Sequence, residues 1–288
     1  YYILILITIR CVSAQPLTVG LIQISPGVAD GYTLFSPNFC PDNDCPTYLI
    51  NNCGEIVNQW PTASIPGLSS KLLPNGLLLR PYFIQHPFMN SGGCGGGIQL
   101  WDFNGNLIWD YVVADNHSTP HHEVTPLPNG NLLVLIWNYR DSVEAVLKGR
   151  ISSTVTGAGI WSDKIIEIRP IFPDSAELIW QWDSWDHIVQ NVSPILPSYG
   201  NPSSHPELFD INYLGLSNGG ADWLHTNAID YNPDLDQIAI SSRHLQEIYI
   251  IDHSTTSYQS ASHSGGSSSK GGDILYRWGN PEAYGKTT

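Results

Sequence analysis

Short apolar runs bounded by turn-forming residues recur along the chain and set the first expectation about its structure. In the clearest case, a Pro-Asn-Gly turn at residues 128–130 leads into an apolar run at residues 132–136. Such a run, rich in β-formers and opened by turn chemistry, is typical of a buried strand. Two histidines, His121 and His122, stand just ahead of this turn, where a rigid scaffold can hold polar groups at a fixed depth.

A short pattern recurs four times and ends each time in an aromatic residue. In its fullest form a glycine precedes two apolar residues and a later tryptophan or tyrosine, and the third copy lacks the glycine. The copies end at Trp60, Tyr111, Trp182 and Trp278. Each of the first three follows another strand-like run, which predicts a hairpin, with turns at residues 51–54 and 102–105 in the first two. We therefore expect the four aromatic residues to occupy equivalent places in successive sheets.

A second repeated element follows the hairpins: a turn at residues 73–76, 127–130 or 232–234 leads into an apolar run. Strands that repeat in groups at this spacing favour an all-β protein, built as a β-propeller or a similar radial array. A two-sheet sandwich with accidental self-similarity is the alternative. The Pro- and Ser-rich insertion at residues 185–223 is expected to lie over one face as a loop or lid, and the Ser/Gly-rich stretch at residues 254–270 to be a flexible loop.

Composition agrees with this fold class and narrows the partners. The 288 residues include 26 Gly, 21 Pro and 10 Trp but only 13% charged residues, which suits an all-β protein with many turns. The net charge of -14 argues against nucleic acid or an anionic membrane as a partner, because nothing neutralises phosphates. A small anionic ligand stays compatible, since it needs only a local cluster of positive groups.

The start of the chain resembles the remnant of a signal peptide at residues 1–14. Residues 1–9 are almost wholly apolar, and residues 12–14 fit a small-residue cleavage site. This interpretation leaves one domain at residues 15–288 and predicts a secreted or periplasmic protein. A buried first strand is the alternative interpretation of the same stretch.

Four cysteines follow this leader, an even number that predicts two disulfides in an exported chain. Cys40 and Cys45 would close a short loop, with Cα atoms within about 7 Å of each other. Cys53 and Cys94 would then tie two strand regions together. A zinc site is the alternative, although no C-x-x-C pair occurs.

The histidine pair has a counterpart in the third repeat. His225 precedes its turn as His121 or His122 precedes the earlier one, and the strand entries align about equally well with either. Arg243 follows the next strand, within S-S-R-H. Equivalent positions of a radial array face one central channel, so one of the pair should converge there with His225 and Arg243. On a strand, His244 would then face away from Arg243.

Converging histidine and arginine side chains indicate an oxyanion site. Arginine offers a planar fork of donors for sulfate- or phosphate-like groups, and imidazole can act as nucleophile, general acid or hydrogen-bond donor near neutral pH. A metal site competes with this interpretation, but no carboxylate recurs beside the histidines, so we expect no metal and no other cofactor. The plainer alternative is that each histidine bonds a backbone group and fixes a loop.

Five motifs, in order, resemble those of the arylsulfotransferase family, the bacterial type that uses an aryl sulfate donor. They are G-Y-T-L-F-S-P at residues 31–37, H-H-E-V-T-P-L-P-N-G-N at 121–131, H-T-N-A-I-D-Y-N-P at 225–233, S-S-R-H at 241–244 and Y-R-W-G-N-P at 276–281. The resemblance covers nearly everything after the leader. It implies a six-bladed β-propeller, of which this chain, truncated at both ends, would cover about four blades.

The resemblance also implies a reaction: ping-pong transfer of a sulfuryl group from a phenolic sulfate ester to a phenol through a sulfated histidine, without a nucleotide donor. The residues that it assigns to sulfate are His225, Arg243 and one of His121 and His122, with Asn227 beside them. The family's nucleophilic histidine follows the Y-R-W-G-N-P motif, and no histidine occurs there in this sequence. We therefore expect that histidine beyond the end of this chain, and little activity from the chain alone.

Two other functions stay open on the sequence. A secreted, non-catalytic propeller could bind ligands or partners through the same channel, and a hydrolase or lyase could use the histidine pair with a metal. For the favoured function the expected partners are a small phenolic sulfate donor and a phenol acceptor, with no nucleic acid and no membrane. A homodimer remains an open arrangement.

Overall fold

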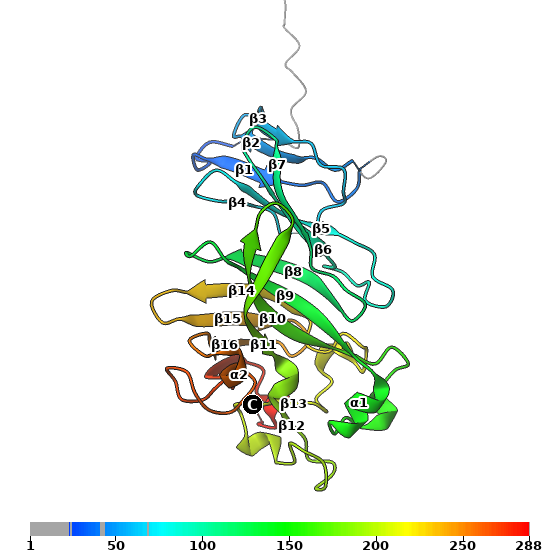
Figure 1. The fold of residues 1–288 in the computed structure, drawn as a ribbon. Coiled ribbons are helices and arrows are strands. Elements are labelled where there is room, and N and C mark those ends of the chain that lie inside the picture. The colour runs from blue at the N-terminus through cyan, green and yellow to red at the C-terminus, as the bar shows by residue number, and fades with distance from the viewer. Residues whose placement is uncertain (1–22, 24, 41–43, 68, 288) are drawn as a thin grey trace, which may run out of the picture.

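The computed structural model describes residues 23, 25–40, 44–67 and 69–287, and within them the protein is nearly all β. The expected leader at residues 1–14 lies outside the described residues. Four antiparallel sheets follow one another in chain order between the two ends of the molecule (Figure 1).

Each sheet is a meander in which consecutive strands are hydrogen-bonded neighbours. The sheets are β1 (Tyr32–Phe35), β2 (Thr47–Asn51) and β3 (Ile56–Trp60); β4 (Lys71–Leu72), β5 (Leu78–Phe83), β6 (Gly96–Trp101) and β7 (Leu107–Val112); β8 (Ser118–Pro126), β9 (Leu132–Arg140), β10 (Ile160–Ile171) and β11 (Ser175–Asp183); and β14 (Thr226–Asn232), β15 (Gln237–Ser242), β16 (Glu247–Asp252) and β17 (Tyr276–Gly279). Four-stranded antiparallel sheets in succession are the building blocks of a propeller. The predicted all-β fold is confirmed, and the count of six blades stays a prediction.

The remaining elements are short and lie in connections within a sheet, between sheets or after the last sheet. They are helices α1 (Ser142–Leu147) and α2 (Ser257–Ser260), the parallel pair β12 (Ile188–Val189) and β13 (Phe209–Asp210), and 3-10 turns η2 (Ser152–Thr154), η3 (Ser184–Asp186), η4 (Pro202–Ser204), η5 (Gly215–Ser217) and η6 (Pro281–Tyr284). None of the helices in the described ranges has the length and apolar composition that crossing a bilayer requires.

The turns recognised in the sequence recur at the same points of the sheets. Leu73 N donates to Leu77 O over 2.8 Å between β4 and β5, and Leu127 N donates to Asn131 O over 2.8 Å between β8 and β9. The second turn needs glycine, because Gly130 has a φ of 85° in the left-handed region. Such turns fix the strand register, and with it the face of each strand that enters the core.

The four aromatic residues of the repeat lie on the last strand of the four sheets, as predicted. They are Trp60 on β3, Tyr111 on β7, Trp182 on β11 and Trp278 on β17. Their exposure differs, because Trp60 and Trp182 are buried whereas Trp278 is exposed. The four aromatic residues therefore share their position on the last strand, but not their degree of burial.

Tryptophan side chains also connect each sheet to the next. The indole Nε1 of Trp60 donates to Asp102 O (2.7 Å), that of Trp109 to Ser175 O (2.7 Å) and that of Trp180 to Thr255 Oγ1 (3.1 Å). Each bond runs from the last strand of one sheet to a turn, a strand end or a loop of the following sheet. Buried indoles normally find such a partner, so these bonds both satisfy the N–H groups and hold neighbouring sheets together.

The insertion at residues 185–223 is more than the expected surface loop or lid. Phe209, Ile211 and Trp223 are buried in the largest hydrophobic cluster, and the Phe209 ring meets that of Tyr249 edge-on at 5.0 Å. The Pro and Ser content of the insertion signalled a loop, but a few well-spaced large apolar residues are enough to bury it.

The stretch at residues 254–270 is not the flexible loop that its composition predicts. Helix α2 starts with a capping box, in which Gln259 N donates to Thr256 Oγ1 (3.2 Å) and Thr256 N donates to Gln259 Oε1 (3.0 Å). The Asp252 carboxylate accepts from the backbone N–H groups of Ser254 (3.0 Å) and Ser268 (2.8 Å). Local hydrogen bonds of short polar side chains fix this segment in place of an apolar core.

One of the two predicted disulfides is present in the structure. Cys40 and Cys45 are bonded, with Cα atoms 5.3 Å apart. The pairing of Cys53 with Cys94 is wrong, since among the described residues both are free thiols. Cys53 is exposed in the turn between β2 and β3. Cys94 is buried just ahead of β6, in a hydrophobic cluster with Met89.

Candidate active site

Two histidines from different sheets meet at one place. His122 lies in β8 and His225 directly precedes β14, and their ring centroids are 4.7 Å apart. Both have left-handed backbone, with φ of 53° and 49°. Residues other than glycine hold this conformation only where the surroundings enforce it, and such positions cluster at functional sites. The shared conformation makes His122, rather than His121, the counterpart of His225, a choice that the sequence left open.

The backbone of His122 is held by the segment that precedes β6. His122 N donates to Gly93 O over 2.7 Å. Gly93 has a φ of 89°, and a Cβ on it would fall 2.3 Å from the His122 ring. Only glycine fits at position 93, so the strained histidine and the glycine depend on each other.

His121 supports the pair from behind. It is buried and stacks on Trp137, with centroids 4.2 Å apart and an interplanar angle of 7°. Its Nδ1 lies 3.1 Å from His122 Nδ1, and its Nε2 lies 3.2 Å from Asp163 Oδ1. The other Asp163 oxygen accepts from Thr226 N over 2.8 Å. One buried carboxylate therefore links the strand of His121 to the residue after His225.

Asp222 and His244 complete the surroundings of His225. The Asp222 carboxylate accepts from His225 Nδ1, and the His244 ring lies 4.7 Å from the His225 ring. Arg243 N donates to His225 O over 3.1 Å, and Arg243 Nη1 lies 3.1 Å from His244 Nε2. The expectation that His244 faces away from Arg243 is wrong, because β15 ends at Ser242 and strand alternation stops there.

A pocket of about 320 Å³ opens at this cluster. Asp222, His225, Arg243 and His244 contribute to its wall, together with Trp161. The structure thus brings His225 and Arg243 to one cavity, and places His122 against His225. His121 lies behind them in the core.

Asn227 lies on the other side of Arg243. It is exposed, and its Oδ1 accepts from Ser241 Oγ over 2.8 Å. It lines a second hollow of about 280 Å³, whose wall also includes Arg243 and Trp278. Arg243 borders both hollows, so a ligand on its guanidinium could reach the His225 side and the Asn227 side.

His122 and His244 favour their neutral forms. Burial, and next the positive charge that His121 would carry, lowers the pKa of His122 from 6.5 to about 4. Burial also lowers the pKa of His244. His244 Nδ1 lies 2.9 Å from Asp222 O, a pure acceptor, and its Nε2 faces the Arg243 donor. This set of partners fits a neutral His244 that carries its proton on Nδ1.

We expect His122 to titrate with a midpoint near pH 4, below the usual value of 6.5. The unfolded chain then binds this proton more tightly than the folded protein, so the free energy of unfolding falls as the pH drops from about 6.5 toward 4. NMR titration of the imidazole C–H resonances, with His122→Asn to identify the signal, measures the midpoint. A midpoint at or above 6 would contradict the desolvated environment described above.

Sequence reasoning missed Asp163, Asp222 and His244. No carboxylate recurs at equivalent places beside the histidines, yet Asp222 reaches His225 from three positions before it, outside the repeated motif. Asp222, His225 and His244 offer ligand atoms within 4.8 Å of one another, so this group could hold a metal ion. Two of the nitrogens already face Asp222 oxygens, which accounts for the arrangement by hydrogen bonding alone.

A larger hollow, of about 550 Å³, lies elsewhere. It is lined by the repeated turns around Pro74 and Pro128 and by Phe172, and Arg169 is the charged residue on its wall. Without histidine or carboxylate groups it offers little for bond-making chemistry. The smaller pocket at His225 is the better candidate.

Comparison with known proteins gives one family match. Residues 84–270, more than half of the chain, match the family model described as Arylsulfotransferase (ASST). No curated protein matches the chain. A solved structure of unknown function from Bacteroides caccae aligns with 82% of this chain and 54% of its own, at 13% identity and a TM-score of 0.39. Kuenenia stuttgartiensis hydrazine synthase aligns with 86% of this chain and 59% of its own, at 11% identity and a TM-score of 0.48. The chain spans less than two thirds of the length of either structure.

Proposed function

Because the chain belongs to the arylsulfotransferase family, we propose that it transfers a sulfuryl group from a phenolic sulfate ester to a phenol. The observation that supports this most directly is the contact between His122 and His225 beside Arg243. Their rings come from different sheets and lie 4.7 Å apart, at the edge of a pocket that Arg243 borders. Segments far apart in the chain thus supply cationic and imidazole groups to one place.

The donors suit the charge that develops during transfer. A sulfuryl group in flight spreads negative charge over its peripheral oxygens, and preorganised donors aimed at these oxygens stabilise it. Arg243 brings a permanent positive charge and a planar fork that can bind two oxygens at once. His122 stands beside His225 as a neutral ring whose Nδ1 faces His121.

Asp222 prepares His225 for proton transfer. With Nδ1–H donated to the Asp222 carboxylate, the Nε2 atom of His225 carries the lone pair. It can accept the proton of the attacking phenol, or return a proton to the phenolate oxygen as its S–O bond breaks. Transfer through a sulfated histidine belongs to this proposal, and the family resemblance assigns that nucleophile to a segment after residues 276–281.

The neighbouring residues take supporting roles in the proposal. His121, which stacks on Trp137 and touches His122, positions the His122 ring. Asn227 and the exposed Trp278 share a hollow with Arg243, where an aromatic ring of donor or acceptor can stack. We further propose an exported protein, because the Cys40–Cys45 disulfide is compatible with an oxidising compartment.

A chromogenic aryl sulfate tests the function. We expect phenol release to rise with the concentration of a second phenol, and mass spectrometry to find the sulfuryl group on that acceptor. If phenol release does not depend on the acceptor concentration and inorganic sulfate is formed, the protein is a hydrolase instead. If the aryl sulfate binds without turnover, the protein is the non-catalytic binder, unless a longer chain that includes the segment after residue 288 restores transfer. Absence of both binding and turnover would contradict the proposal.

A further inference from the structure

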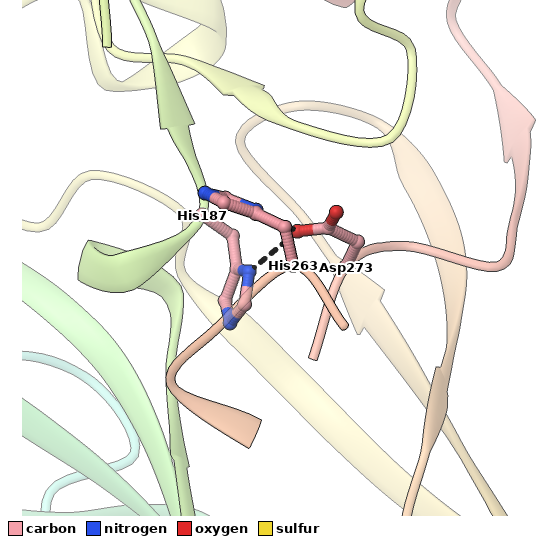
Figure 2. Close-up of side chains that lie close together, drawn as sticks. All are labelled: His187, His263 and Asp273. Atoms are coloured by element: carbon pink, nitrogen blue, oxygen red, sulfur yellow. Dashed lines mark hydrogen bonds and ion pairs between the residues drawn. The ribbon is translucent and has the colours of Figure 1, made fainter. Parts of the chain in front are cut away.

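A second group of histidine and carboxylate side chains is formed by residues that the proposed reaction does not use. His187, His263 and Asp273 offer ligand atoms within 4.8 Å of one another (Figure 2). His187 follows η3, His263 follows α2 and Asp273 precedes β17, so three separate segments meet here. Neither histidine belongs to a repeated motif.

The partners of His187 call for a cation. His187 is fully buried, its Nε2 lies 2.7 Å from Ser260 O, and its Nδ1 lies 2.8 Å from Asp273 Oδ1. A backbone carbonyl only accepts, so Nε2 carries the proton. A neutral ring then points the Nδ1 lone pair at a carboxylate oxygen, and two acceptors repel. Either an additional proton or a metal ion between the two atoms removes this repulsion.

His263 approaches the same carboxylate oxygen. Its Nδ1 lies 2.7 Å from Asp273 Oδ1, so one oxygen faces two imidazoles. Histidines that bind metal usually donate the other ring N–H to a carbonyl or carboxylate, as His187 donates to Ser260 O. We propose that His187 Nδ1, His263 Nδ1 and the Asp273 carboxylate bind a divalent transition-metal ion, zinc by preference.

The donor set fits such an ion with little movement. Two imidazoles and one carboxylate suit zinc and related metals, and three protein ligands leave a position open for water or another ligand. A metal about 2.0–2.1 Å from each donor holds neighbouring donors about 3.3 Å apart, so the present contacts must open by about 0.5 Å. The His263 side chain is 61% exposed and has room to move outward.

The buried half of the site is already rigid. Trp182 stacks on His187 with centroids 5.7 Å apart and an interplanar angle of 5°, and Trp182 Nε1 donates to Gly272 O over 2.7 Å. A Cβ on Gly272 would lie 2.6 Å from His187 Nε2, so this position admits only glycine without a shift. A bound metal would fasten the segment that carries His263 to the insertion at residues 185–223, which carries His187.

Cobalt(II) titration of the metal-free protein tests the site, because Co²⁺ takes zinc ligands and absorbs in the visible range. We expect one equivalent to bind, zinc to displace it, and zinc to raise the melting temperature. His263→Ala should weaken Co²⁺ binding at least about tenfold and abolish the rise in melting temperature. The exposed His263 is the residue of choice, since His187 variants could fail to fold.

Two variants distinguish metal binding at this site from metal binding at other histidines. His205→Ala removes a partly exposed histidine that pairs with Glu207, and should leave Co²⁺ affinity unchanged. His225→Ala should also retain the bound equivalent. If the folded protein does not bind one equivalent of Co²⁺, the proposal is overturned. Asp273 would then only share protons with the two histidines. Loss of binding in His225→Ala but not in His263→Ala would overturn it too, by placing the metal at Asp222, His225 and His244.

Discussion

Arg243→Ala, made in a chain that also carries the expected nucleophilic histidine, should lower kcat/KM for a chromogenic aryl sulfate by about 10²–10³-fold, the effect of removing one oxyanion donor from a preorganised site. Arg243 is exposed, and within the described ranges its side chain has one hydrogen bond, to His244, so the fold should survive the change. Arg243→Lys should restore part of the rate, since an ammonium keeps the charge but cannot make the bidentate contact. Steady-state kinetics with a saturating phenol acceptor measure both variants.

A matched control is Arg169→Ala, which removes an exposed arginine that pairs with Glu177 away from the pocket. We expect its kcat/KM to stay within about twofold of the unmodified protein, because surface pairs have little influence beyond their own position. Equal losses in both variants would show a general effect of charge rather than a role at the site. An unchanged rate in Arg243→Ala would remove Arg243 from the proposed mechanism.

The largest expected loss of stability comes from Arg277→Ala, at about 3–5 kcal/mol of unfolding free energy. Arg277 Nε donates to Glu247 Oε1 over 2.9 Å, and the two side chains are only 6% and 0% exposed. Removing the guanidinium leaves the Glu247 carboxylate buried with Tyr249 OH as its remaining side-chain donor. The variant also loses the bond from Arg277 Nη1 to Pro206 O (2.9 Å), which ties the insertion to β17. Urea denaturation followed by tryptophan fluorescence measures the change.

Arg169→Ala again provides the comparison, because it removes the same residue type from a carboxylate pair at the surface. The Arg169 and Glu177 side chains are 57% and 47% exposed, so this pair should contribute no more than about 1 kcal/mol. Similar losses in the two variants would contradict the assignment of Arg277 as a buried structural residue. Arg277→Met, which keeps most of the volume but not the charge, should still be destabilised, because Glu247 stays unpaired.

Repetition made much of the fold predictable. Turns such as the one before Leu132 are recognisable from their turn-forming residues. The aromatic residue at the end of each copy marks the last strand of each sheet. The convergence of His225 with Arg243 followed from equivalent places in the repeat. These features depend on local spacing and periodicity, which a sequence displays directly.

Contacts made outside the repeat were not predictable in this way. Asp222 and Asp163 reach the histidines from segments whose composition does not mark them, and Cys94 lies among buried residues instead of beside Cys53. The insertion was expected to be a loop because it is rich in Pro and Ser, yet Phe209 packs into the core. Such outcomes depend on which distant segments pack together, and pattern alone does not contain that information.

The left-handed backbone of His122 and His225 affects the directed evolution of a more thermostable version of this protein. Glycine adopts positive φ without steric cost, so selection for heat resistance alone rewards glycine wherever another residue is forced into this conformation. Such a selection would find positions 122 and 225 early, and each gain there would remove an imidazole from the pocket. Thermostability and catalysis thus compete at these two positions, and a library intended to preserve activity has to keep both fixed.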